Sequence, residues 1–182
     1  MTIKTKVGAA ICSVSVIIGL VLSQAGDFTS ANGNHLRFSK QAMEVMGNAE
    51  SCRRDPYLCP AKIVTQGIGH TGKGVSAVSK ASDQQIAQWF AEDQLDAQNC
   101  IEVNVERKLG KHLPQGVFDG VGSFIFNVGC GQFTKSTMYR YLLAGKTVAA
   151  CEQLPRWIYS GKTVLQGLVT RRDKEKALCL SH

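Results

Sequence analysis

The chain of 182 residues begins with an apolar run that restricts how the remainder can fold. From Val7 to Gly26 no side chain is charged, with Lys4 and Lys6 before the run and Asp27 after it. Twenty helical residues span about 30 Å, the thickness of a bilayer's hydrocarbon core. The order of charges predicts a cytoplasmic N-terminus and an exported body. We therefore expect residues 1–26 to form a transmembrane anchor helix, with the rest of the chain folding outside the cytoplasm.

The same run is only weakly apolar. Nine of its residues are Val, Ile or Leu, each contributing roughly −0.3 to −0.6 kcal/mol on an insertion scale, and most of the others are small or polar. Its residence in a membrane is therefore expected to be marginal. A cleaved signal peptide is the alternative, because Ser23-Gln24-Ala25 has the small-x-small form of a cleavage site. Either way, the body enters a compartment where disulfides persist.

The number of cysteines is odd. Six lie in the exported body, where they allow fifteen pairings, and the seventh, Cys12, lies within the apolar run. A thiol inside a bilayer is shielded from exchange until its segment leaves the membrane. Taken alone, such a cysteine is more often a small apolar filler than a reactive group. The cysteines of the body are Cys52, Cys59, Cys100, Cys130, Cys151 and Cys179.

The exported body is expected to be one domain, residues 37–182, preceded by a small polar linker at 27–36. Its pattern is mainly helical. Ser82 and Gln85 form a capping box, S-x-x-Q, which predicts the start of a long helix. Further helices are expected at 38–50, 117–128, 135–143, 147–154 and 165–180, and a small Gly-rich sheet at 63–80. The segment AESCRRDPYLCPAKIVTQGIGH, which starts at Ala49, is expected to begin as a loop.

Three separated motifs follow one another in the body. Eight residues separate Glu50 from Cys59, and five separate Cys59 from Thr65, which begins a T-x-G-x-G-H run. This spacing resembles the catalytic signature of phage-type lysozymes, glycoside hydrolase family 24, whose middle residue is usually aspartate. SFIFNVGCGQF at 123–133 resembles the S-F-x-x-N-x-G run of the family, and GLVTRRDKEKALC at 167–179 resembles its C-terminal helix.

The resemblance implies a lysozyme-like α+β fold, mainly helical, with a small β-hairpin or sheet at the active site. It also implies hydrolysis of the β-1,4 linkage between N-acetylmuramic acid and N-acetylglucosamine in peptidoglycan, which causes host cell lysis. No cofactor is implied, and the sequence contains no metal cluster or nucleotide loop.

The implied catalytic residues are Glu50, Cys59 and Thr65. Glu50 would protonate the departing oxygen, and Cys59 as a thiolate would activate water or attack as a nucleophile. Thr65 would hydrogen-bond the attacking water. Each residue also has an ordinary structural interpretation: a solvated helix-end glutamate, a half-cystine and a strand threonine. His70 is expected to be a hydrogen-bonded structural histidine.

The cysteines narrow the resemblance to signal-anchor-release endolysins, because Cys59 replaces aspartate and a further cysteine lies in the anchor. This implies a Cys52–Cys59 disulfide that keeps the enzyme inactive. Once the anchor leaves the bilayer, Cys12 would attack Cys52 and release Cys59. Cys100, Cys130, Cys151 and Cys179 are then structural; of their three pairings, Cys100–Cys130 and Cys151–Cys179 are favoured.

The formal net charge of +7 favours anionic partners, and the segment 156–182 carries six Lys or Arg against two acids. Zinc-finger spacing and RNA-binding aromatic motifs are absent from the sequence, which argues against nucleic acid. The expected partners are peptidoglycan glycan strands and the host inner membrane, with a monomer whose domain lies in the periplasm and becomes soluble on release. The alternative is a non-enzymatic, disulfide-rich exported module that binds glycan or inhibits another protein.

Overall fold

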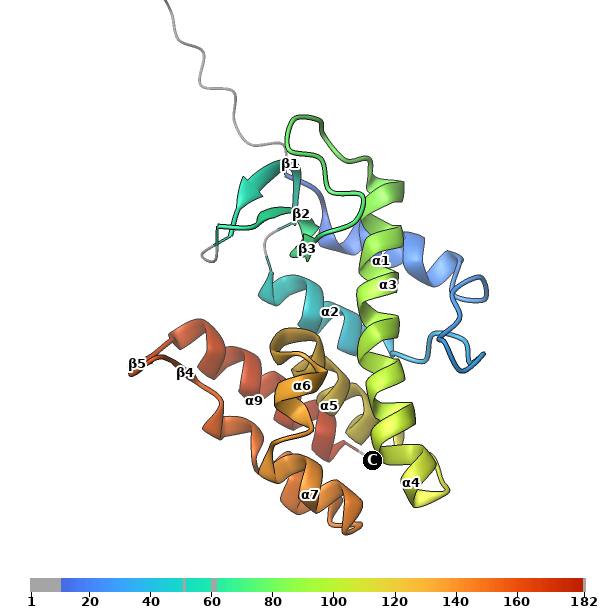
Figure 1. Ribbon diagram of the computed structural model, residues 1–182, viewed down its shortest axis with the longest axis vertical. Helices are drawn as coiled ribbons and strands as arrows, with labels where there is room; N and C mark the ends of the chain where they lie inside the picture. The colour runs from blue at the N-terminus through green and yellow to red at the C-terminus, as the bar shows by residue number, and fades with distance from the viewer. Residues whose placement is uncertain (1–10, 51, 60–61, 182) are drawn as a thin grey trace, which may run out of the picture.

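The computed structural model describes residues 11–50, 52–59 and 62–181. A long helix, α3 (Asp83–Ile101), runs from a small sheet at one end of the molecule to a group of helices at the other (Figure 1). Both parts share one continuous cluster of buried apolar side chains. The arrangement is mainly helical with a small sheet, which agrees with the α+β class expected from the sequence.

The sheet contains three antiparallel strands in the order β1-β2-β3. The sequence predicts a loop between the helix at 38–50 and the sheet at 63–80, and the first strand corrects that expectation. This strand contains Pro56, which lies where its pairing becomes irregular, between Arg53 and Tyr57. Proline is tolerated on an edge strand or at a bulge, but a proline in the sequence argues against predicting a strand there. The strands are β1 (Cys52–Leu58), β2 (Val64–Ile68) and β3 (His70–Thr71).

Among the described residues, three helices begin at serine caps, which are Ser39, Ser82 and Ser136. Each of these serines accepts a hydrogen bond at its side-chain oxygen from the backbone N–H three residues later. The bond at Ser82 is the N-cap half of the predicted capping box, and it confirms the start of α3. At its other end α3 continues through a π-helical turn into one more helical turn. The elements are α2 (Lys40–Ala49), η1 (Glu102–Glu106) and α4 (Arg107–Leu109).

Helix α5 (Gln115–Val128) lies at the centre of the helical part, and its predicted apolar stripe is buried from Val117 to Phe124. Helix α9 (Gln166–Leu180) packs against it at very short range. A Cβ atom at Gly120 would lie 2.5 Å from the backbone oxygen of Glu175, so only glycine permits this approach. The close packing brings the side chains of α9 toward the centre of the molecule.

Several short elements complete the helical part. The helices predicted at 135–143, 147–154 and 165–180 are present with shorter or slightly shifted ends. A small helix and a two-stranded hairpin were not predicted, because elements of two to four residues carry no readable periodicity. The short elements are α6 (Cys130–Phe133), α7 (Thr137–Leu143), α8 (Thr147–Cys151), η2 (Leu154–Arg156), β4 (Tyr159–Ser160) and β5 (Thr163–Val164).

The N-terminal apolar run forms helix α1 (Val14–Ser23), which packs against α2 and α3 (Figure 1). Ile17, Ile18 and Val21 are buried in this contact. Part of the run that the sequence assigns to a membrane anchor thus lies in the protein core. Among the described residues, no helix is long and apolar enough to cross a bilayer. Residues 1–10 of the expected anchor lie outside the described residues.

The predicted linker at 27–36 is irregular, but it is bound to the body. Ser30 Oγ and Asn32 Nδ2 each donate to Glu102 Oε2 at 2.9 Å. Glu102 itself is only 5% exposed. The polar composition predicted a loop, whereas the buried carboxylate that holds it comes from the π-helical turn and was not predicted.

Three disulfides connect the elements. One joins the N-terminal segment to the first residue of β1, one joins α3 to α6, and one joins α8 to α9. The last two agree with the pairing favoured by the sequence. The bonds are Cys12–Cys52, Cys100–Cys130 and Cys151–Cys179, and Cys59 belongs to none of them.

Candidate active site

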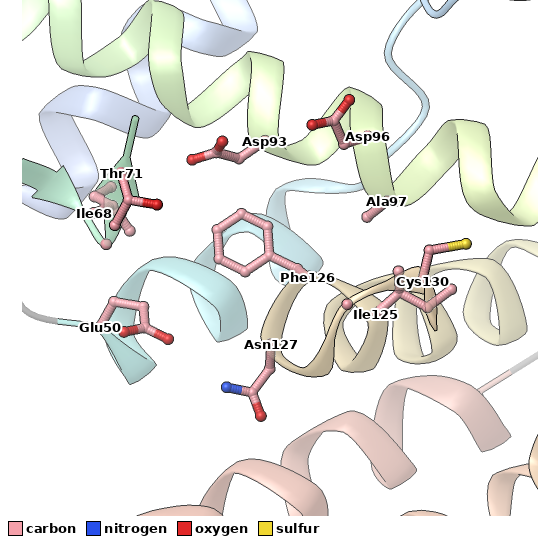
Figure 2. Close-up of a pocket in the computed structure, with 12 residues that line it drawn as sticks. Glu50, Ile68, Thr71, Asp93, Asp96, Ala97, Ile125, Phe126, Asn127 and Cys130 are labelled. Atoms are coloured by element: carbon pink, nitrogen blue, oxygen red, sulfur yellow. The ribbon is translucent and has the colours of Figure 1, made fainter. Parts of the chain in front are cut away.

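A cleft of about 510 Å³ opens between the sheet and the helical part. Figure 2 shows side chains entering it from the end of α2, from the sheet, from α3 and from α5. The lining combines three carboxylates with an aromatic ring and an amide. The lining residues are Glu50, Ile68, Gly69, Thr71, Asp93, Asp96, Ala97, Ile125, Phe126, Asn127, Gly129 and Cys130.

Glu50 lines this cleft, at the position that immediately follows α2. Its Oε1 accepts a hydrogen bond from Arg171 Nη1 at 2.8 Å, while its side chain remains 31% exposed. Gly69 has φ +78 and passes close to the carboxylate; a Cβ there would lie 3.5 Å from Glu50 Oε2. A buried arginine therefore fixes one carboxylate oxygen, while the group stays accessible from the cleft.

Arg171 belongs to a buried ion network behind Glu50. Its Nε donates to Glu175 Oε1 at 3.0 Å, and Glu175 is fully buried. Arg172 donates to the other oxygen of Glu175 and to Oδ1 of Asn127, which lines the cleft. Burial lowers the pKa of Arg172, against the raising effect of Glu175. The network connects Glu50 to Asn127 through side chains that are shielded from water.

This network corrects an expectation based on charge. Arg171 and Arg172 are two of the six cations of the segment 156–182, but they are only 4% and 1% exposed. Both bind Glu175, which lies four and three residues later on the same helix. Six cations less these two leaves four for the basic surface of the segment.

Cys59 follows the last residue of β1, where the chain turns toward β2. Its backbone N–H donates to Ile63 O at 3.0 Å, and it is half-buried. It is not one of the described residues that line the cleft. The pKa of the Tyr57 phenol is raised by burial and by the negative charges of Glu50 and Cys59, while the positive charge of Arg53 lowers it.

Thr65 lies on β2 and is 2% exposed. Its Oγ1 donates to the backbone oxygen of Ile63 at 3.0 Å, and it pairs with Tyr57 across the hairpin. Like Cys59, it is not one of the described lining residues. The structure thus places Glu50 in the cleft, and Cys59 and Thr65 on the hairpin that leads into its wall.

His70 is hydrogen-bonded as expected. Its Nδ1 lies 3.0 Å from both carboxylate oxygens of Asp93, and its ring stacks on Trp89 with centroids 4.9 Å apart. Asp93 lines the cleft together with Asp96, both on α3 (Figure 2). These aspartates are not among the site residues expected from the sequence. Their spacing of three within a predicted helix already places them on one face, which is a signal that would have found them.

The two cysteines that border β1 are separated by the pairing of that strand. Cys52 pairs with Ile68, and Leu58, which precedes Cys59, pairs with Val64. The two pairings are four residues apart along β2, which corresponds to about 13 Å along the sheet. A disulfide requires Cα atoms within roughly 7 Å of each other. Cys52 is bonded instead to Cys12, with their Cα atoms 5.2 Å apart.

Known proteins are similar to this chain in sequence and in structure. The phage lysozyme family model matches residues 47–175. The SAR-endolysin of Escherichia phage P1 is 36% identical, over 96% of this chain and 93% of its own length. The crystal structure of the active form of the P1 phage endolysin has a TM-score of 0.80 at 34% identity, and covers 95% of this chain and 96% of that one.

The secreted inactive form of the P1 phage endolysin is a less similar structure. Its TM-score is 0.54 at 35% identity, covering 79% of this chain and 96% of that one. The two forms are almost equally identical in sequence to this chain, so the sequence does not account for the difference in TM-score. The structure described here therefore resembles that of the active form more closely, and over a larger share of this chain.

Proposed function

Since this chain belongs to the phage lysozyme family and is a muramidase-type hydrolase, we propose that it is an endolysin that cleaves the β-1,4 linkage between N-acetylmuramic acid and N-acetylglucosamine. The observation that carries this proposal is the Glu50 carboxylate, which lines the cleft and is held by buried Arg171. A fixed carboxyl group in a cleft of ligand-binding size meets the first requirement of glycoside hydrolysis.

Glu50 acts as the general acid that protonates the departing glycosidic oxygen. Cys59 acts as a thiolate on the anomeric side, through water or directly, and Thr65 orients the water. Both residues lie on the hairpin whose strand β2 continues from Thr65 to Ile68 in the cleft wall.

A disulfide exchange controls this activity. Residues 1–26 first anchor the chain in the host inner membrane, with the linker 27–36 and the domain 37–182 in the periplasm, and a Cys52–Cys59 bond keeps the enzyme inactive. After release, the Cys12 thiolate attacks Cys52 Sγ. A Cys12–Cys52 bond forms, the Cys52–Cys59 bond breaks, and the electron pair stays on Cys59 as a thiolate, so no external oxidant or reductant is needed.

Three observations support this sequence of events. The structure contains the Cys12–Cys52 bond with Cys59 outside the disulfides, as the released state requires. Its conformation is closer to the active than to the inactive P1 endolysin. The weakly apolar run also suits two environments, since Ile17 and Val21 of α1 are as suited to lipid as to the core that buries them here. The bond to Cys12 favours a retained N-terminus over a cleaved one.

The released enzyme then degrades peptidoglycan in the periplasm as a soluble monomer, and host cell lysis follows. Its partners are the glycan strands and, before release, the inner membrane. Nucleic acid has no part in this function. The remaining basic surface assists the approach to anionic wall material through long-range attraction.

Lysis of permeabilised Gram-negative cells, followed by turbidity, tests the role of Glu50. Glu50→Gln should lower the rate about 100-fold or more, the usual contribution of a general acid. Glu44→Gln is the matched control, because this exposed glutamate of α2 pairs only loosely with Lys40 at 3.8 Å. Mass spectrometry of borohydride-reduced products should find reduced muramic acid ends. Reduced glucosamine ends instead would contradict the proposed bond.

A further inference from the structure

The N-terminal segment meets the sheet through its backbone as well as through a disulfide. Cys12 N–H donates to Cys52 O at 3.2 Å, and Ile11 forms an isolated antiparallel bridge with Arg53. Since β1 is an edge strand, its outer side has free backbone groups that can receive such a segment. The Cys12–Cys52 bond therefore lies within a short β contact, which sets the direction in which Cys12 approaches.

Arg54 adds a side-chain contact to this junction. Its Nε and Nη2 donate to the two oxygens of Asp83, both at 2.9 Å, and its Nη1 donates to Ile11 O at 2.7 Å. The planar guanidinium thus uses two nitrogens on a carboxylate and directs the third at a carbonyl of the N-terminal segment. Ile11 is 72% exposed, so its side chain contributes little to holding the segment, and the contact depends on its carbonyl.

Arg54 is fixed by parts of the body other than the segment it binds. Its backbone oxygen accepts from Ala81 N–H at 3.0 Å and from Gln66 Nε2 at 2.9 Å. Asp83 is in turn the first residue of α3, where a negative side chain is favoured by the helix dipole. The carbonyl-binding group is therefore held from the sheet and from α3, and it does not depend on the N-terminal segment for its orientation.

We propose that Arg54, held by Asp83, is the positioning residue of the disulfide exchange: it binds the Ile11 carbonyl of the released segment and places Cys12 beside Cys52. This inference rests on the proposed exchange. Ile11 immediately precedes Cys12, so fixing its carbonyl restricts the path of the attacking sulfur. Holding two reacting groups together in this way raises their effective concentration, which accelerates the attack without changing the chemistry of either thiol. Arg54 does not take part in the bond changes.

The rate of exchange in the full-length chain tests this proposal. The chain is expressed in cells, the membrane is depolarised, and samples are quenched with acid and N-ethylmaleimide at intervals. Non-reducing peptide mapping then gives the ratio of Cys12–Cys52 to Cys52–Cys59. We expect Arg54→Gln to slow the appearance of Cys12–Cys52 about tenfold, as for the loss of one charge-assisted hydrogen bond. Asp83→Asn should also slow it, because the guanidinium is then less firmly held.

Two controls separate positioning from a general effect on folding. Lys80→Gln removes a nearby cation that pairs with Asp55 rather than Asp83, and it should exchange at the wild-type rate. Arg54→Lys keeps the positive charge on a single nitrogen and should recover part of the rate. Once the Cys12–Cys52 bond has formed, the lytic activity per molecule of Arg54→Gln should equal that of the wild type, which a merely misfolded variant would not achieve.

The outcomes distinguish the two proposals. A wild-type chain that exchanges, together with Arg54→Gln and Asp83→Asn chains that exchange equally fast, overturns the role of Arg54 and leaves the exchange itself standing. A wild-type chain that lyses cells while it keeps the Cys52–Cys59 bond overturns the exchange, and the role of Arg54 with it.

Discussion

Cys52 and Cys59 lie at the two ends of β1, too far apart to share a disulfide while that strand is paired with β2. A bond between them therefore requires a different course of the hairpin. The proposed exchange is for this reason also a conformational change: breaking the Cys52–Cys59 bond allows β1 to pair with β2 along its whole length. Arg54 can bind Ile11 before that step, because Asp83 of α3 holds its guanidinium. The redox partner of Cys52 and the shape of the hairpin are coupled.

The first prediction concerns Cys12. A Cys12→Ser chain should keep the Cys52–Cys59 bond after membrane release and remain inactive in the turbidity assay. Addition of a mild reductant should then restore lysis, because reduction frees Cys59 by another route. Cys52→Ala is the matched control and should be active with or without reductant. Lysis by untreated Cys12→Ser chains at the wild-type rate would contradict the exchange.

A second prediction concerns the fit between α1 and α2. A Cβ at Gly47 would lie 2.6 Å from Val14 Cγ1, so Gly47→Ala should force α1 away or change the Val14 rotamer. We expect this overpacking to lower the free energy of unfolding by about 1–3 kcal/mol, measured by urea titration of the chain with Cys12–Cys52 formed.

A second substitution tests whether the contact with Val14 causes this loss of stability. Adding Val14→Ala to Gly47→Ala should recover part of the loss, because it removes the methyl group that clashes. Gly19→Ala is the control, since a Cβ there meets no atom within 4 Å, and it should stabilise α1 slightly. A double variant no more stable than Gly47→Ala would show that the cost arises elsewhere.

A third prediction concerns Arg171. Its separate nitrogens bind Glu50 and Glu175 at 2.8 and 3.0 Å, and a single lysine ammonium cannot reproduce this geometry. Arg171→Lys should lower lytic activity about tenfold, assayed well below the unfolding temperature so that loss of stability does not contribute. Lys174→Gln, on an exposed position of the same helix, should retain full activity. Full activity of Arg171→Lys would mean that Glu50 needs no fixed partner.

A fourth prediction concerns stability in acid. Burial acts to raise the pKa of Glu106, but hydrogen bonds from Arg37, the Leu113 N–H and His112 outweigh it and lower the pKa below its ordinary value. A carboxyl group with a lowered pKa in the folded state stabilises the protein above its unfolded pKa, and this contribution is lost as pH falls through the folded pKa. The free energy of unfolding should therefore decrease as pH drops below roughly 4.

Glu106→Gln tests this assignment. The variant should be less stable than the wild type at neutral pH, and the difference between them should shrink progressively in acid. Urea unfolding of both proteins from neutral pH into the acid range measures it. Glu44→Gln, whose partner Lys40 is exposed, should follow the wild-type curve. A Glu106→Gln curve parallel to that of the wild type at every pH would be the contrary result.

Local features of the sequence determined much of the fold. The capping box at Ser82, the apolar stripe from Val117 and the T-x-G-x-G-H run each rely on neighbours within a few residues, and each lies where it was expected. The predicted helix end also placed Glu50 just beyond α2, where it lies, while its catalytic role was implied by the family resemblance. Strand β1 was missed, since Arg53 to Pro56 has no alternating apolar pattern and depends on β2 for its pairing.

By itself, therefore, the sequence determined the class of fold, the helix boundaries near caps and the family motifs, all of which depend on short-range patterns. Only the tertiary structure decided the burial of Arg171 and Arg172, the cleft position of Asp93 and Asp96, and the packing of α1 on α2 and α3. Each of these features depends on contacts with segments distant in the sequence. Arg171 binds Glu50, Asp93 faces His70 of the sheet, and α1 packs on the apolar side chains of α2 and α3. A side chain's environment in a folded protein is set by such distant partners, which local periodicity does not contain.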